Sequence, residues 1–77
     1  MMRRFHKHIN FNDGTRLSIL AGQYITRDTK RPFEIAFKNH MGVVMYGRIK
    51  GVDFRDGAIR DLTANEVRII AHLLGGE

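Results

Sequence analysis

The sequence predicts a small α+β domain, a four-stranded antiparallel β-meander with one C-terminal α-helix packed on one face. Two observations support this fold class. Apolar and polar residues alternate through much of the first 50 residues, as in half-buried strands, whereas the last stretch repeats with the 3.6-residue period of a helix. With 77 residues, the chain is expected to form one domain, residues 1–77, and is too short for a second.

The first two strands are expected at residues 4–11 and 15–26, joined by the turn residues Asn12–Gly14. A three-residue loop pairs Ile9 with Leu17 and keeps the apolar residues of both strands on one face. A two-residue turn would place them on opposite faces. We therefore predict a type I turn that its glycine closes in the left-handed conformation.

Two further strands are expected at residues 33–38 and 43–50. Pro32 cannot donate a ladder hydrogen bond, so it suits the start of a strand or an edge. The length of the turn before the last strand is ambiguous, and two alternating sets therefore compete for its inward face: Val43, Met45 and Ile49, or Val44 and Tyr46.

The helix is expected at residues 64–74. Thr63 followed three residues later by Glu66 forms a capping box, and Gly75 offers the left-handed residue that ends a helix. A helix of about three turns is marginal alone, so it should lie on the sheet. Four residues have the spacing of one helical face: Val67, Ile70, Ala71 and Leu74.

Ile69 and Leu73 lie on the other side of this helix, so apolar residues cover more than half of its circumference. One sheet cannot easily bury so wide a surface. We expect these two residues to be covered either by the Val52–Ile59 segment or by a second copy of the chain, and we favour a homodimer. Within that segment, Val52, Phe54 and Ile59 are candidates for the core or for a short strand.

The charge is strongly positive and unevenly placed. The chain has 13 Lys and Arg against 8 Asp and Glu, a net charge of +5. Residues 1–50 carry ten Lys and Arg against three acids, whereas residues 51–77 carry three against five. The sheet is thus the basic half, which favours an anionic partner, most often nucleic acid. The alternative is that a basic surface only keeps a small protein in solution.

The face of the sheet opposite the helix is where we expect a partner to bind. Besides the expected contact residues named below, this face would include Arg4, His6, His8 and Leu20. Bases stack on aromatic side chains while cations follow the phosphates, but tyrosine and arginine are also enriched at protein interfaces. The residues expected to contact nucleic acid or a protein partner are Arg16, Tyr24, Lys38, Tyr46, Arg48 and Lys50.

The sequence gives little support for catalysis or for a cofactor. Ser18 is the only serine, no nucleophile turn surrounds it, and no glycine-rich phosphate loop precedes the helix. His6 and His8 have the spacing of two ligands of one zinc ion. His40 is the only other histidine before the helix, so a third and a fourth ligand are missing and we assign no metal site. We therefore expect no enzymatic activity.

The absence of cysteine, of an apolar signal-peptide region and of a run of about 20 apolar residues leads us to expect a cytoplasmic protein without a membrane association. Our first hypothesis is a stoichiometric binding module for nucleic acid or a nucleoprotein complex. The alternative is a protein-binding inhibitor or accessory factor, such as a phage or mobile-element anti-defence protein, that binds a host protein through the same face.

Overall fold

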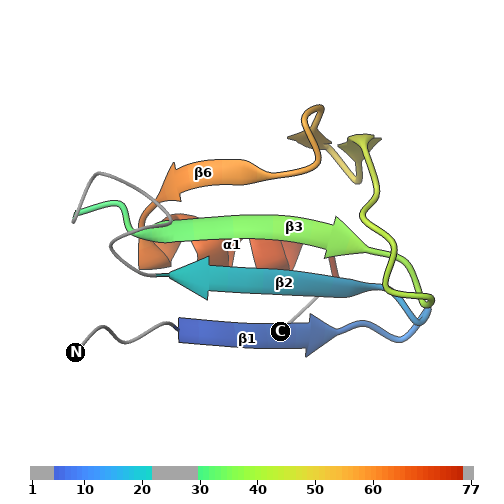
Figure 1. The fold of residues 1–77 in the computed structure, drawn as a ribbon. Helices are drawn as coiled ribbons and strands as arrows, with labels where there is room; N and C mark the ends of the chain where they lie inside the picture. Colours follow the sequence, from blue (N-terminus) through green and yellow to red (C-terminus); the bar gives the residue numbers. More distant parts are fainter. Residues whose placement is uncertain (1–4, 22–29, 76–77) are drawn as a thin grey trace.

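The computed structural model describes residues 5–21 and 30–75 (Figure 1). The described elements are β1 (Phe5–Asn10), β2 (Arg16–Ala21), β3 (Phe33–Lys38), β4 (Gly47–Ile49), β5 (Val52–Phe54), β6 (Ile59–Leu62) and α1 (Ala64–Leu73). Strands β1, β2, β3 and β6 form a four-stranded antiparallel sheet in that order, and β4 and β5 form a separate two-stranded ribbon. Helix α1 packs on one face of the sheet against β3, which confirms the α+β fold class.

The first hairpin has the predicted register. Ile9 pairs with Leu17, and the three-residue loop is closed by a 2.9 Å hydrogen bond from the Phe11 amide to the Thr15 carbonyl. The φ of Gly14 is +88°, the left-handed conformation expected for the residue that closes the turn. Strand β2 is described as far as Ala21, and the remainder of the expected second strand lies outside the described residues.

The expected fourth strand at residues 43–50 is wrong, because β6 is the fourth strand of the sheet. The chain pairs with the end of β3 only at Val44, in an isolated bridge. It reverses at Lys50 and Gly51, whose φ values of 49° and 85° are those of the two-residue type I′ turn that joins β4 to β5. The three residues of β4 thus pair with β5 and not with β3.

The structure distinguishes between the two sets of residues that were alternatives for the inward face of the 43–50 segment. Met45 and Ile49 pack against the core, as in the first set, but Val43 is 57% exposed. Val44 and Tyr46, the second set, lie on the opposite side and line a hollow there. The first alternative is therefore correct for two of its three residues.

The core lies between α1 and the sheet. Alternate residues of β2 and β3 point toward the helix, and the β4–β5 ribbon covers one end of the core. Phe37 lies at that end, with its ring centroid 6.0 Å from Phe11 and 5.9 Å from Phe54. The buried cluster consists of Leu17, Ile19, Ile35, Phe37, Val52, Phe54, Leu62, Val67, Ala71 and Leu74.

The predicted capping box starts α1. The Thr63 hydroxyl accepts from the Glu66 amide at 3.1 Å, and Glu66 Oε1 accepts from the Thr63 amide at 2.9 Å. At the other end, Leu74 is the C-cap and Gly75 has a φ of +102°. No helix within the described ranges is long and apolar enough to cross a membrane.

Ile69 and Leu73 are 53% and 55% exposed. The Val52–Ile59 segment does not cover them, because Val52 and Phe54 are buried in the core instead. That option is therefore wrong, and coverage by a second copy stays a prediction.

Candidate functional site

The candidate site is the face of the four-stranded sheet opposite α1, here called the open face. It is formed by the residues of β1, β2 and β3 that alternate with those pointing toward the helix. Reading across the three strands, the open face consists of Asn10, Arg16 and Lys38, then His8, Ser18 and Ala36, then His6, Leu20 and Glu34.

Two cations lie side by side at one end of the open face. Arg16 on β2 is directly opposite Lys38 on β3, a position in which Cβ atoms are about 5 Å apart. Within the described ranges no carboxylate pairs with either cation, and Arg16 Nε is buried without a hydrogen-bond partner. This end of the face therefore carries uncompensated positive charge.

The pKa of His8 reports the same charge. It lies below the ordinary value of 6.5, first because reduced contact with solvent disfavours the charged ring. Repulsion from His6, Lys38 and Arg16 lowers it further. An anion bound beside Arg16 and Lys38 would offset this repulsion and favour the protonated ring.

The two histidines of β1 contact each other edge-on, with ring centroids 4.5 Å apart. His6 Nε2 also lies 3.4 Å from the hydroxyl of Ser18, which is only 4% exposed. A substrate would have little access to a hydroxyl that is so deeply buried. No third side chain in the described part of the chain forms a hydrogen bond that orients the His6 ring, as a catalytic triad requires. Among the described residues, no group of three or more His, Asp or Glu is placed to hold a metal ion.

A hollow of about 250 Å³ adjoins the cations on the open face, here called the Tyr46 hollow. Leu20 and Ala36 contribute from the strands, and the ring of Tyr46, which is 68% exposed, contributes from the loop before β4. Glu34 lines it as well, and its carboxylate accepts from Arg60 Nε at 2.7 Å. Asp56 lines the hollow too, so the hollow combines apolar surface, an exposed aromatic ring and two carboxylates.

The structure brings together three of the six expected contact residues: Arg16, Lys38 and Tyr46. Arg48 and Lys50 do not lie on the open face, because β4 belongs to the separate ribbon. Lys50 Nζ donates to the carbonyl of Leu74 at 3.0 Å, and thus supports the C-terminal end of α1. Tyr24 lies outside the described residues.

Arg48 is exposed on the ribbon, opposite Asp53 in the β4–β5 register. The structure also adds Ser18 and Glu34 to the site, which the sequence analysis missed. The sequence pattern could have indicated both residues, because each alternates with inward-pointing residues of its own strand and therefore lies on the open face. Gly57 lines the hollow too, but nothing local in the sequence indicates its contact with Tyr46.

Comparisons of the chain with protein-family models, with curated protein sequences and with solved structures find no match in any of the three. Function is therefore inferred from the chemistry of the open face.

Proposed function

We propose that the protein binds single-stranded nucleic acid, alone or within a nucleoprotein complex, through the open face and without turnover. The observation that carries this proposal is the Arg16–Lys38 pair beside a hollow with an exposed aromatic wall. Cations that follow a phosphate backbone next to an aromatic ring are the usual parts of a single-strand binding surface. The net charge of +5 also favours nucleic acid as the partner. We propose that the protein acts in the cytoplasm.

Each part of the site then has a role. Arg16 and Lys38 neutralise phosphates, and the exposed side of the Tyr46 ring stacks on a base that enters the hollow. Glu34 can accept a hydrogen bond from a base amino group, because an ionised carboxylate is only an acceptor. His8 adds a further positive charge when it is protonated.

The first test separates the cations from the ring by the salt dependence of binding. Anisotropy of a labelled oligonucleotide of about 12 nucleotides should be measured over a salt series. Arg16→Gln and Lys38→Gln should each weaken binding to all sequences and flatten the salt slope by about 0.7 per lost phosphate contact. Arg68→Gln is the matched control, because it removes one charge from α1, on the other side of the sheet.

Tyr46→Ala should weaken single-strand binding by about 1 to 3 kcal/mol and leave the salt slope nearly unchanged, because stacking releases no counterions. Tyr46→Phe keeps the ring and should bind like the wild type. Duplex binding should be less affected by either variant, since paired bases are already stacked. Unchanged single-strand binding in Tyr46→Ala and Lys38→Gln together would refute the proposal.

The alternative is a protein-binding inhibitor or accessory factor that uses the same face, for example a phage or mobile-element anti-defence protein directed at a host protein. The exposed Tyr46 beside a hollow favours it, because tyrosine and arginine are typical anchors of protein interfaces. It predicts no single-strand affinity even below physiological salt. It also predicts that a partner captured from cytosol remains after nuclease treatment, whereas a nucleic-acid-dependent partner is lost.

A further inference from the structure

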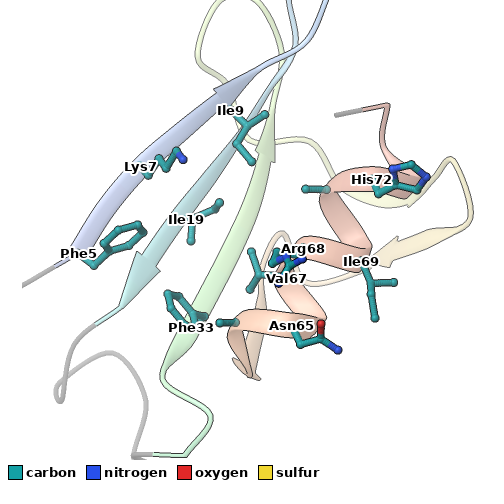
Figure 2. A pocket seen from close by; sticks show the side chains of 12 residues that line it. Phe5, Lys7, Ile9, Ile19, Phe33, Asn65, Val67, Arg68, Ile69 and His72 are labelled. Atoms are coloured by element: carbon teal, nitrogen blue, oxygen red, sulfur yellow. The ribbon is translucent and has the colours of Figure 1, made fainter. Parts of the chain in front are cut away.

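A second feature of the molecule lies on the helix side of the sheet, away from the open face. A groove with a volume of about 580 Å³ runs between β1 and α1 (Figure 2). Phe5, Lys7 and Ile9 of β1 point across it toward the helix. The groove exists because α1 packs against β3, and no other described element covers the β1 edge on this face of the sheet (Figure 1).

The surface of this groove is largely apolar and accessible. Phe5 is 47% exposed and Ile69, on the helix side, is 53% exposed. Ile9 and Phe33 are only partly buried and lie between the groove and the core. Exposed apolar surface that is continuous with a core is typical of a binding site for an apolar ligand or a partner.

The dimensions of the groove fit a helix. Four strands about 4.8 Å apart make a sheet wide enough for two helices, which pack with axes about 8 to 10 Å apart. Helix α1 takes one of these two positions, and the groove is the other. The six residues of β1 span about 20 Å, which is the length of a helix of about 13 residues.

The charge of the groove selects the kind of helix. Lys7, Arg68 and His72 line it, and none of the described residues that line it is acidic. Within the described residues none of these three forms an ion pair with a carboxylate. A helix with an apolar stripe flanked by Asp and Glu would place carboxylates against all three and complement the groove in both respects.

A second copy of α1 would complement the groove poorly. The helix that it would insert carries one acid, Glu66, and one base, Arg68, so it brings no net negative charge to a basic groove. A self-complex through this surface therefore gains no charge complementarity, whereas an acidic helix does.

We propose that the groove between β1 and α1 binds an acidic amphipathic helix of a partner protein. The site is separate from the open face, so the protein can hold a helix on one side of the sheet and a second ligand on the other. Lys7 and Arg68 provide the charge recognition, and Phe5 and Ile9 provide the apolar contact.

The test uses the full chain and two labelled peptides of about 18 residues, each with leucines spaced along one helical face. One peptide has glutamate at the flanking positions and the other has lysine. The glutamate peptide should bind at least about tenfold more tightly. Amide chemical shifts should change in β1 and α1 and not around Arg16 and Lys38.

Charge reversal supplies the decisive variants. Arg68→Glu and Lys7→Glu should each weaken the glutamate peptide by about tenfold and strengthen the lysine peptide. Arg55→Glu is the matched control, because it changes the net charge equally at a side chain that is 83% exposed and lies after β5. Phe5→Ala should weaken both peptides while leaving oligonucleotide binding unchanged.

Four results would overturn the proposal. Equal affinity for the two peptides would show that charge does not select the ligand. An equal effect of Arg55→Glu and Arg68→Glu would show that only net charge matters. Sedimentation that detects a dimer dissociated by Phe5→Ala would assign the groove to a second copy. Shift changes confined to the open face would show that the peptide imitates a phosphate backbone there, which leaves the proposed nucleic-acid function standing.

Discussion

The ring of Tyr46 lies directly against the backbone of Gly57. A Cβ atom added at Gly57 would be 2.6 Å from Tyr46 Cε1, closer than packed side chains allow, and 3.2 Å from Cδ1. The loop before β6 therefore supports one side of the ring while the other side remains exposed to the hollow. This contact decides where the only described tyrosine stands relative to the open face.

Gly57→Ala should displace the Tyr46 ring and weaken single-strand binding by about fivefold or more, a part of the energy expected of one stacked base. Its φ of +81° also strains any substitution. Gly51→Ala is the matched control, because Gly51 has a φ of +85° and no atom of the described residues lies within 4 Å of the added Cβ. Both variants should have a similarly lowered melting temperature, but only Gly57→Ala should bind the oligonucleotide more weakly when binding is measured by anisotropy. Equal affinity of the two variants would disprove the role of the Gly57–Tyr46 contact.

Single-strand binding should strengthen as the pH falls. The pKa of free His8 lies below 6.5, chiefly through desolvation and then through repulsion from His6, Lys38 and Arg16. A phosphate bound nearby raises that pKa, so the complex takes up a proton between the free and the bound value. Titration from pH 7.5 to about 5 should show this rise in affinity, and His8→Gln should reduce it. An identical pH profile in the variant would place the phosphates elsewhere.

The same lowered pKa affects stability with a defined sign. Because the unfolded chain binds a proton at His8 more readily, protonation favours unfolding, and stability falls as the pH drops below 6.5 toward the folded-state pKa. Denaturant midpoints measured across this window should fall less in His8→Gln than in the wild type. His40→Gln, in the turn after β3, controls for the loss of a histidine.

Gly14→Val should destabilise the protein by more than about 1 kcal/mol. The φ of Gly14 is +88°, and an added Cβ would also be 3.1 Å from the Cβ of His40. Gly14→Asn should cost less, because asparagine tolerates the left-handed region better than valine does. Urea unfolding measures both variants, and equal midpoints would show that backbone conformation is not what requires this glycine.

Glu66 should contribute to acid sensitivity. The hydrogen bond from the Thr63 backbone amide lowers the pKa of Glu66 below the ordinary 4.5. Desolvation opposes this effect, and the interaction with Arg31 lowers the pKa further. A lowered folded-state pKa means that this stabilisation is present above pH 4.5 and is lost as the pH falls through the folded value. Glu66→Gln should therefore be less stable than wild type at neutral pH and approach it near pH 3, as followed by helical circular dichroism.

If Ile69 and Leu73 meet a second copy, sedimentation velocity should show a dimer at high protein concentration. Ile69→Glu should shift it to a monomer with unchanged helicity, because the side chain is 53% exposed and not part of the buried core. Met41→Glu, at a side chain that is 75% exposed in the turn after β3, should not. A wild-type monomer at every concentration would remove the homodimer.

Short-range features of the fold were predictable from the sequence. The register of β1 and β2 follows from keeping Ile9 and Leu17 on one face, and the start of α1 follows from Thr63 and Glu66. These features depend on residues that are close in the chain, so turn geometry, alternation and capping chemistry are sufficient to specify them. Alternation within each strand also placed Arg16 and Lys38 on the open face.

Tertiary structure decided the rest. Whether the segment after β3 or β6 completes the sheet depends on competition between distant segments for the same strand edge. In the structure β6 pairs with β3, and the segment after β3 turns at Lys50 and Gly51 into the β4–β5 ribbon. That turn carries Lys50 to the end of α1 and leaves Tyr46 beside Gly57. No periodicity encodes such contacts, because each depends on where two independently specified segments meet in space.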